Sequence, residues 1–311
     1  MNNTIPWVEK YRPKNLNTII LNPYNKKFIN NIIETNYFPN LLFYGPPGTG
    51  KTTTVINLIK KYQDKNNQVN KGHIIHLNAS DERGIDTIRT QIYQYVLSKN
   101  IMGDGIKFVI LDEIDYMTKN AQKALKYIIQ NNKLNVRFCI ICNYISKIDP
   151  SLQNEFLKIK FYNLNKKDIK QFLKNICVKE NIKIKNYQLD DIILLFKYDI
   201  RSMINYIQSN YLFINNNFII KKEIYFKIID NLKNNKNIEL INDEINKLIK
   251  NYNINKYDII ENIINILIKK YNTNEWINLY KGFIRNISNN NNNDLIYFFL
   301  LESCKLFKTL K

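Results

Sequence analysis

Two patterns of apolar residues divide this chain of 311 residues. Up to about residue 160, short runs such as 41–44 and 108–111 are continuously apolar, which is typical of strands buried on both faces of a sheet. Stretches with helical spacing separate these runs, so the pattern predicts βαβ units and a mostly parallel sheet. From about residue 162 the apolar positions keep helical spacing, which indicates a second half built mainly from helices.

The helical half contains both buried and amphipathic segments. Residues 189–196 are apolar enough to form a buried helix. Residues 238–248 and 259–267 each carry one apolar stripe, which can pack within a bundle or against a neighbouring chain. The first half is therefore expected to form an α/β domain, and the second half to form helical domains.

Composition adds two expectations. No apolar stretch approaches the roughly 18 residues of a membrane span, and residues 1–6 lack the basic and apolar regions of a secretion signal, so we expect a soluble intracellular protein. The formal net charge of +19 suits a phosphate-rich partner. However, Asn, Lys, Ile and Tyr all have A/T-rich codons, and an AT-rich genome would produce much of the lysine excess. The charge supports nucleic-acid binding only together with specific motifs.

A phosphate-binding motif follows the first apolar run. Residues 45–52 fit the pattern G-x-x-x-x-G-K-[ST]. In this pattern backbone N–H groups wrap the phosphates, Lys51 reaches the β and γ oxygens, and the Thr52 hydroxyl suits Mg²⁺ at the start of a helix. The motif predicts a nucleoside triphosphate site, because the strand, loop and helix that it requires are all expected here.

A second motif supplies carboxylates. The apolar run 108–111 ends in Asp112 and Glu113. A buried parallel strand delivers such acids at its carboxyl end, where open α/β sheets bind ligands. Asp112 would hold Mg²⁺ directly or through water, and Glu113 would polarise the water that attacks the γ-phosphate. The alternative is that Glu113 and Asp115 cap the helix that follows.

Several segments together resemble one family. They are 7–13, 45–52, 77–85, 112–115 and 137–144, and residues 199–201 show a weaker resemblance. Through these segments the chain resembles replication factor C small subunits, which are clamp loaders of the AAA+ ATPases. The resemblance implies an α/β AAA+ core with a parallel sheet, a small helical lid domain and an all-α C-terminal collar domain for oligomerisation. The corresponding boundaries are 1–161, 162–230 and 231–311.

The resemblance also implies further site residues. Asn143 matches the residue that senses the γ-phosphate and positions water, although it could instead cap the strand end. Arg201 matches the lid arginine that reaches back to the nucleotide, or is a solvated helix residue, because Tyr198 stands where the family usually has glycine. The catalytic set is Lys51, Asp112, Glu113, Asn143 and Arg201, and Thr52 and Asp112 would bind the metal. The nucleotide-binding set is Val8, Ile20, Gly45, Pro46, Pro47, Gly48, Thr49, Gly50, Lys51, Thr52, Thr53, Asn143 and Arg201, of which Val8 and Ile20 border the adenine in relatives or belong to the core.

Contacts with DNA and with a clamp are implied around one helix. In relatives, groups at such a helix start track the DNA backbone, and contacts of this kind carry no base specificity. The DNA-binding candidates are Arg83, Gly84 and Ile85. The apolar face of the helix would either dock on the sliding clamp or pack in the core, and it consists of Ile92, Tyr95 and Val96.

One segment departs from the family pattern. Relatives carry Ser-Arg-Cys after the sensor strand, and its arginine enters the ATP site of the neighbouring subunit. This chain has Asn-Glu-Phe at 154–156. Glu155 would repel the charge that develops near a γ-phosphate, and Lys158 would need a shifted alignment. The chain would therefore use a finger from its neighbour and offer none in return.

These residues predict an ATP-dependent subunit of a hetero-pentameric clamp loader. It would help to open a sliding clamp and load it onto primer-template DNA, hydrolysing ATP with Mg²⁺ in the assembled complex, in the nucleus if the organism is eukaryotic. The first alternative is another AAA+ ATPase that remodels DNA, such as a helicase loader or a branch-migration motor. The second is a scaffold subunit that binds nucleotide without turnover.

Overall fold

The computed structural model describes most of the chain. The described residues are 5–67, 71–80, 85–98, 105–131, 136–211, 222–234, 237–252, 256–271, 273–287 and 293–309. They form two compact units: residues up to Ile182 together with Phe196–Ser209, called the first unit, and Lys183–Leu195 together with residues from Asn210 onward, called the second unit. Within the described ranges, no helix is long and apolar enough to cross a membrane.

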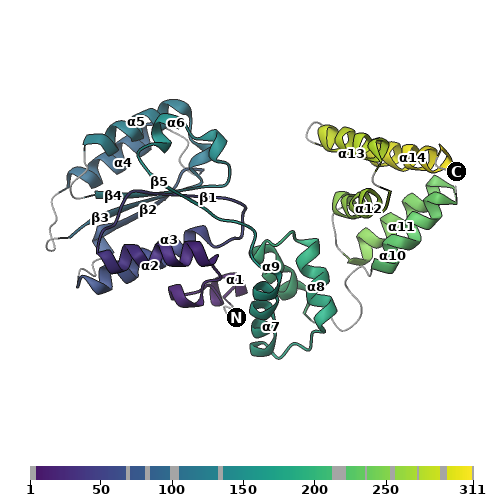
Figure 1. The fold of residues 1–311 in the computed structure, drawn as a ribbon, viewed down its shortest axis with the longest axis horizontal. Helices are drawn as coiled ribbons and strands as arrows, with labels where there is room; N and C mark the ends of the chain where they lie inside the picture. Colours follow the sequence, from purple (N-terminus) through teal and green to yellow (C-terminus); the bar gives the residue numbers. More distant parts are fainter. Residues whose placement is uncertain are drawn as a thin grey trace. The chain divides into compact units, whose positions relative to one another are not determined.

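A five-stranded sheet forms the centre of the first unit (Figure 1). Its order is β2-β3-β4-β1-β5, and all four neighbouring pairs are parallel. Parallel strands place their carboxyl ends at one edge of the sheet, where the order of the strands reverses and ligands bind. The strands are β1 (Leu41–Tyr44), β2 (Ile74–Asn78), β3 (Lys107–Asp112), β4 (Val136–Cys142) and β5 (Leu157–Lys160).

Helices cover both faces of the sheet. Figure 1 shows α2 and α3 on one face and α4, α5 and α6 on the other. Side chains alternate along a strand, so Phe108 and Ile110 of β3 join the core on the α2–α3 side, whereas Val109 and Leu111 join the opposite core. The helices of this unit are α1 (Trp7–Lys10), α2 (Pro23–Thr35), α3 (Lys51–Lys65), α4 (Ile85–Leu97), α5 (Lys119–Asn131), α6 (Pro150–Gln153), α7 (Lys166–Lys179) and α9 (Ile200–Asn210).

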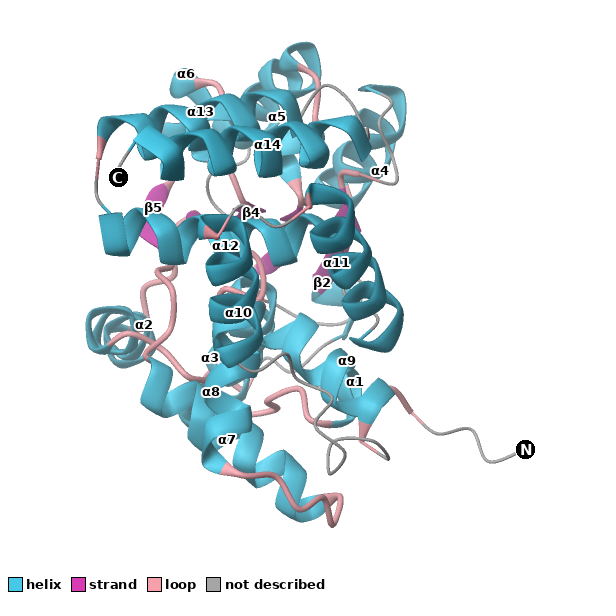
Figure 2. Ribbon diagram, turned by 90° about the vertical axis from the view of Figure 1, so that its right-hand side faces the viewer, coloured by secondary structure: helices cyan, strands magenta, loops and turns pink. Residues whose placement is uncertain are grey.

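The second unit is helical in its described part, and Figure 2 draws α10 to α14 in cyan. Its core gathers the apolar stripes of the helices, including Ile241, Ile245, Ile259 and Ile263, all almost fully buried. The helix α10 runs across residue 230, and its Ile228, Ile229 and Leu232 join the same core. The helices are α8 (Asn186–Leu195), α10 (Lys222–Lys233), α11 (Ile238–Tyr252), α12 (Lys256–Tyr271), α13 (Asn274–Ile287) and α14 (Asn293–Thr309).

The architecture confirms the fold class predicted from the sequence. A parallel α/β core comes first, and helices make up the rest of the described chain. Each buried strand is a short apolar run, and each helical stripe faces a core, so local pattern and tertiary packing agree. The three domain boundaries remain predictions.

Candidate functional site

The phosphate loop connects β1 to α3 at the carboxyl edge of the sheet. Gly48 and Gly50 have φ angles of +68° and +88°, which glycine adopts readily and other residues do not. A Cβ atom on Gly48 would lie 1.9 Å from the Asp199 Oδ1 atom at the start of α9. The loop therefore requires glycine at position 48 for two reasons, its own conformation and the close approach of Asp199.

Lys51 begins α3 and is almost buried, with 7% of its surface exposed. Its Nζ atom donates hydrogen bonds to Gly45 O and Pro46 O, both at 2.8 Å, and to Asn143 Oδ1 at 2.9 Å. Burial lowers the pKa of the Lys51 ammonium, while the attraction of Asp112 opposes this change. The amide of Asn143, which follows β4, thus contacts the ammonium group of Lys51. The structure therefore brings these two predicted site residues together.

Thr52 and Asp112 form a candidate metal pair. The Thr52 hydroxyl donates to Asp112 Oδ2 at 2.6 Å, and Asp112 Oδ1 accepts from the Glu113 backbone N–H at 2.9 Å. Mg²⁺ prefers hard oxygen ligands and is commonly held by one or two carboxylates together with phosphate oxygens. Both side chains line one pocket, so the donor set fits Mg²⁺.

Glu113 has an unusual backbone conformation. Its φ and ψ angles are 56° and 35°, a left-handed conformation that costs a residue other than glycine about 1–3 kcal/mol. Its side chain makes no cap hydrogen bond to the 3₁₀-helix Ile114–Tyr116, and Asp115 Oδ2 accepts instead from Tyr144 N at 3.3 Å. The Glu113 side chain thus does not cap this 3₁₀-helix but lines the pocket, whereas Asp115 lies in the first turn of the helix, where an acid is favoured.

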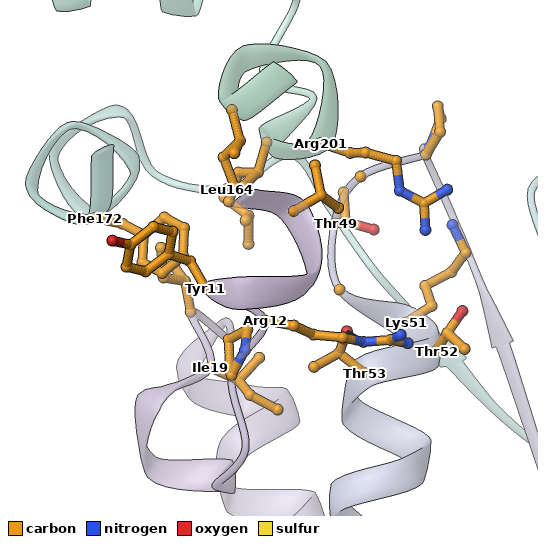
Figure 3. Close-up of a pocket in the computed structure, with 18 of the residues that line it drawn as sticks. Tyr11, Arg12, Ile19, Thr49, Lys51, Thr52, Thr53, Leu164, Phe172 and Arg201 are labelled. Carbon is orange, nitrogen blue, oxygen red and sulfur yellow. Dashed lines mark hydrogen bonds between the residues drawn. The ribbon is translucent and has the colours of Figure 1, made fainter. Parts of the chain in front are cut away.

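One pocket of the first unit contains most of the predicted site residues (Figure 3). Figure 3 shows Lys51 and Arg201 on one side of it, and Tyr11 and Phe172 on the other. Gly45 and Pro46 are not part of the pocket lining and contact Lys51 through their carbonyl groups. The predicted residues in the lining are Val8, Ile20, Pro47, Gly48, Thr49, Gly50, Lys51, Thr52, Thr53, Asp112, Glu113, Asn143 and Arg201.

The pocket has two chemically different ends. The polar end consists of residues 47–53 with Asp112, Glu113, Asn143 and Arg201. The apolar end has Tyr11 and Phe172 on the side opposite Lys51 and Arg201 (Figure 3), and the apolar lining residues assigned to it are Val8, Tyr11, Ile19, Ile20, Leu164, Phe172 and Ile204. A charged cradle beside an apolar, partly aromatic wall suits a ligand with a phosphate chain and a planar base.

Sequence reasoning missed much of the apolar end. Tyr11 and Arg12 lie in the segment that carried the family resemblance, so that segment held a signal. Leu164 lies in the loop after β5, and Phe172 lies in α7. Neither residue is part of a sequence motif that marks a binding site. The lining residues that the sequence did not assign are Glu9, Tyr11, Arg12, Pro13, Thr18, Ile19, Leu164, Phe172, Ile200 and Ile204.

The structure describes the predicted clamp contacts but not the predicted DNA contacts. Arg83 and Gly84 lie outside the described residues, and Ile85 begins α4 without a described side chain. Ile92 and Val96 are 0% and 8% exposed. They belong to the core on the face of the sheet that α4 and α5 cover, and Tyr95 also packs against this core. This face of α4 therefore packs in the core and is not free to dock on a clamp.

The segment at 154–156 forms a turn between α6 and β5. Glu155 Oε1 accepts a hydrogen bond from Gln130 Nε2 of α5 at 2.6 Å, and Phe156 is buried. Lys158 is exposed and donates to Gln153 Oε1 at 3.3 Å. The turn thus presents a carboxylate already engaged with α5, where the family pattern has an arginine.

Comparison with known proteins agrees with this geometry. Residues 41–164 match the model of the ATPase family associated with various cellular activities, AAA. Replication factor C subunit 3 of Schizosaccharomyces pombe is 39% identical over 206 residues, and subunit 5 of Homo sapiens is 40% identical over 206 residues. Each match covers 66% of this chain, and 59% and 60% of the two relatives. The chain thus spans about three fifths of the length of these relatives.

A solved structure shares the fold at low sequence identity. The RuvB Holliday junction branch migration motor of Thermotoga maritima has a TM-score of 0.54 and 16% identity, covering 84% of this chain and 80% of that one. At this identity the likeness concerns the fold alone. It agrees with a parallel α/β core followed by helices.

Proposed function

We propose that this chain, which is a homologue of replication factor C subunits and carries an AAA ATPase domain, is an ATP-hydrolysing small subunit of a clamp loader. One observation carries the proposal: loop, strand and helix residues that are distant in sequence converge on one pocket with a charged and an apolar end. Lys51, Asp112 and Asn143 come from three different segments at the carboxyl edge of the sheet. Lys51 donates a hydrogen bond to Asn143, and Asp112 accepts one from Thr52, the residue next to Lys51.

The polar end would perform the chemistry. Lys51 would exchange its bonds to loop carbonyls for bonds to phosphate oxygens, while Asn143 keeps the ammonium oriented. Thr52 and Asp112 would hold Mg²⁺, which supplies charge neutralisation on the phosphates when bound. Glu113 would orient and polarise the attacking water, a role supported by its place in the lining of the same pocket as Asp112.

Arg201 would connect nucleotide state to the helices that follow the core. It lies near the start of α9 and lines the pocket, so phosphate charge would favour one position of that helix. Asp199 caps the same helix by accepting from Arg201 N at 3.0 Å, and contacts Gly48 of the loop. The pocket and α9 are thus expected to move together, which is how ATP binding would be transmitted to neighbouring subunits.

The partners follow from the family and are proposals for this chain. ATP binding would favour a spiral assembly that opens a ring clamp, and primer-template DNA would trigger hydrolysis and release. DNA contacts around Arg83 would be made to phosphates and would carry no base specificity. Because the turn at 154–156 has no arginine, the ATP site of the facing neighbour would lack a finger. The complex would work inside the cell, and in the nucleus of a eukaryotic host.

Reconstitution with co-expressed neighbours tests this function. We expect a hetero-oligomer by mass measurement, and ATPase activity that rises when primer-template DNA and a sliding clamp are both added. The salt dependence of DNA binding should be steep and similar for unrelated duplexes. DNA unwinding or junction migration without any clamp would favour a different AAA+ machine. ATP binding with no turnover at this chain's site would favour a scaffold subunit.

A further inference from the structure

The segment from Trp7 to Pro13 is attached to α7, α9 and α3 at once. Trp7 N donates to Gln208 Oε1 of α9 at 2.9 Å. At the other end, Asn57 Nδ2 of α3 donates to Pro13 O at 3.0 Å. Between these points, Lys10 Nζ and the Tyr11 hydroxyl both donate to Glu180 at the end of α7, the former at 2.5 Å. We call Lys10, Tyr11 and Glu180 the clasp.

Glu180 is held firmly by the end of its helix. It is the last residue before the chain turns, and Asn181 adopts φ 56° there. Asn181 N donates to Val178 O at 3.1 Å and Ile182 N donates to Cys177 O at 2.8 Å, the two bonds of a Schellman motif. The motif fixes the backbone from which the Glu180 side chain extends at the terminus of α7, and only 17% of that side chain is exposed.

Charge strengthens the clasp. The hydrogen bonds from Lys10 and Tyr11 lower the pKa of the Glu180 carboxyl, so it is ionised at neutral pH. An exposed lysine–carboxylate pair alone contributes little, and the Lys10 side chain is 48% exposed. The Tyr11 hydroxyl bonds to the same ionised, largely buried acceptor, and such charge-assisted hydrogen bonds are stronger than neutral ones.

Tyr11 has a second role in the pocket. It is part of the apolar end, and its neighbour Arg12 donates from Nε to Thr53 Oγ1 at 3.2 Å. Thr53 follows Thr52, the candidate metal ligand, on the first turn of α3. One short segment therefore connects the end of α7 to the wall of the apolar end and to the start of the phosphate-binding helix.

We propose that Glu180 is a positioning residue for the nucleotide: it holds Tyr11 as a wall of the apolar end and thereby makes release of the base require opening of the clasp. The inference rests on the proposed nucleotide-binding function and adds a residue that lies outside the pocket lining. When the clasp is closed, α7, α9 and Tyr11 move as one body against the base. When it is open, the apolar end loses its wall, and the nucleotide leaves faster.

Release of a fluorescent, ribose-labelled ADP from the chain of 311 residues tests the proposal by stopped flow. Tyr11→Phe and Glu180→Ala should each speed release about tenfold, since a charge-assisted hydrogen bond is worth about one such factor. The double variant should also release about tenfold faster, not about a hundredfold, because both changes break the same Tyr11–Glu180 hydrogen bond and the half-exposed Lys10–Glu180 pair adds little. Glu180→Gln keeps an acceptor for the Tyr11 hydroxyl and should lie between wild type and Glu180→Ala.

A matched control uses Glu244 in the second unit. Its carboxylate accepts from Lys227 Nζ at 3.0 Å and from Asn231 Nδ2 at 3.2 Å, so it also joins a lysine and a second donor. Glu244→Ala should leave the release rate unchanged. The single-turnover hydrolysis rate of the reconstituted complex should also stay unchanged in Glu180→Ala, because Glu180 lies outside the pocket lining and the polar end is intact. A lower hydrolysis rate with unaltered release would mean that Glu180 supports the core in general, and would overturn the proposal.

Tryptophan fluorescence supplies a measurement that needs no nucleotide. Trp7 is 9% exposed, packs edge-on against Tyr11, and is one of two tryptophans in the chain. In a Trp276→Phe background, opening the clasp should increase acrylamide quenching of Trp7. If Trp276→Phe does not fold, the difference between the wild type and Trp7→Phe gives the same signal.

The outcomes separate the two proposals. If the wild-type chain binds no labelled nucleotide, the proposed function fails, whatever Trp7 does. If the wild type binds nucleotide while Tyr11→Phe and Glu180→Ala leave both release and Trp7 quenching unchanged, the clasp proposal alone fails. Tyr11→Phe removes one oxygen atom only, so it keeps the test decisive even if Glu180→Ala does not fold.

Discussion

The polar and apolar ends of the pocket are built in different ways. The polar end collects groups from the carboxyl ends of neighbouring strands, so Lys51, Asp112 and Asn143 meet wherever the sheet forms. The apolar end collects Tyr11, Leu164 and other side chains from the beginning of the chain and from segments after the sheet. Apart from Arg201 of α9, the polar end therefore depends on the sheet order, whereas the apolar end depends on how α7, α9 and residues 7–13 pack together.

Among changes to this chain itself, the largest expected effect is at the polar end, on the chemical step. Glu113→Gln should preserve ATP binding and lower steady-state turnover in the assembled complex by about 10²–10⁴-fold, because an amide cannot polarise water as a carboxylate does. ATP affinity of the same variant, measured by equilibrium titration, serves as the control. Turnover at the wild-type rate would remove Glu113 from the mechanism.

A smaller loss, this time in binding, should follow from Lys51→Ala. The variant loses a buried cation that bonds to the loop and to Asn143, and the phosphates lose a charged donor. ATP affinity should fall by about 10–100-fold, the range for hydrogen bonds to charged groups. Lys60→Ala removes an exposed lysine from the same helix and should not change affinity. Equal affinities for both variants would contradict the role of Lys51.

The apolar end should respond more weakly and only in affinity. Phe172→Ala removes a partly buried ring from the wall, and we expect ATP affinity to fall by about 3–10-fold while turnover at saturating ATP stays constant. Val178→Ala, at a position of α7 that is 65% exposed, is the control. If Phe172→Ala reduced turnover as strongly as Glu113→Gln, the two ends would not be separable.

The smallest effect is expected outside both ends. Glu155 bonds to Gln130 and is absent from the pocket lining, so Glu155→Ala should leave ATPase activity of the reconstituted complex within experimental error. In contrast, removing the finger of the subunit that faces Lys51 should abolish turnover here, since such arginines contribute about 10³–10⁵ in rate. A large loss from Glu155→Ala would show that the turn at 154–156 takes part in catalysis.

The same contrast explains how much of the molecule could be predicted. The strands β1 and β3 and the polar end were predictable, because a buried strand followed by Gly-rich or acidic residues has few alternative structures. The burial of Ile92 and Val96 was not decided by their spacing, since a core face and a docking face have the same period. The pairing of Tyr11 with Glu180 joins residues 169 positions apart, and no local pattern marks such a contact.

Gly48 marks a close approach between the phosphate loop and the start of α9. Its α-carbon faces Asp199 so closely that any side chain would collide with the first residues of α9. The methyl group added by Gly48→Ala would displace the start of α9, and Arg201 with it, from the phosphate loop. The substitution would also strain a backbone with φ +68°.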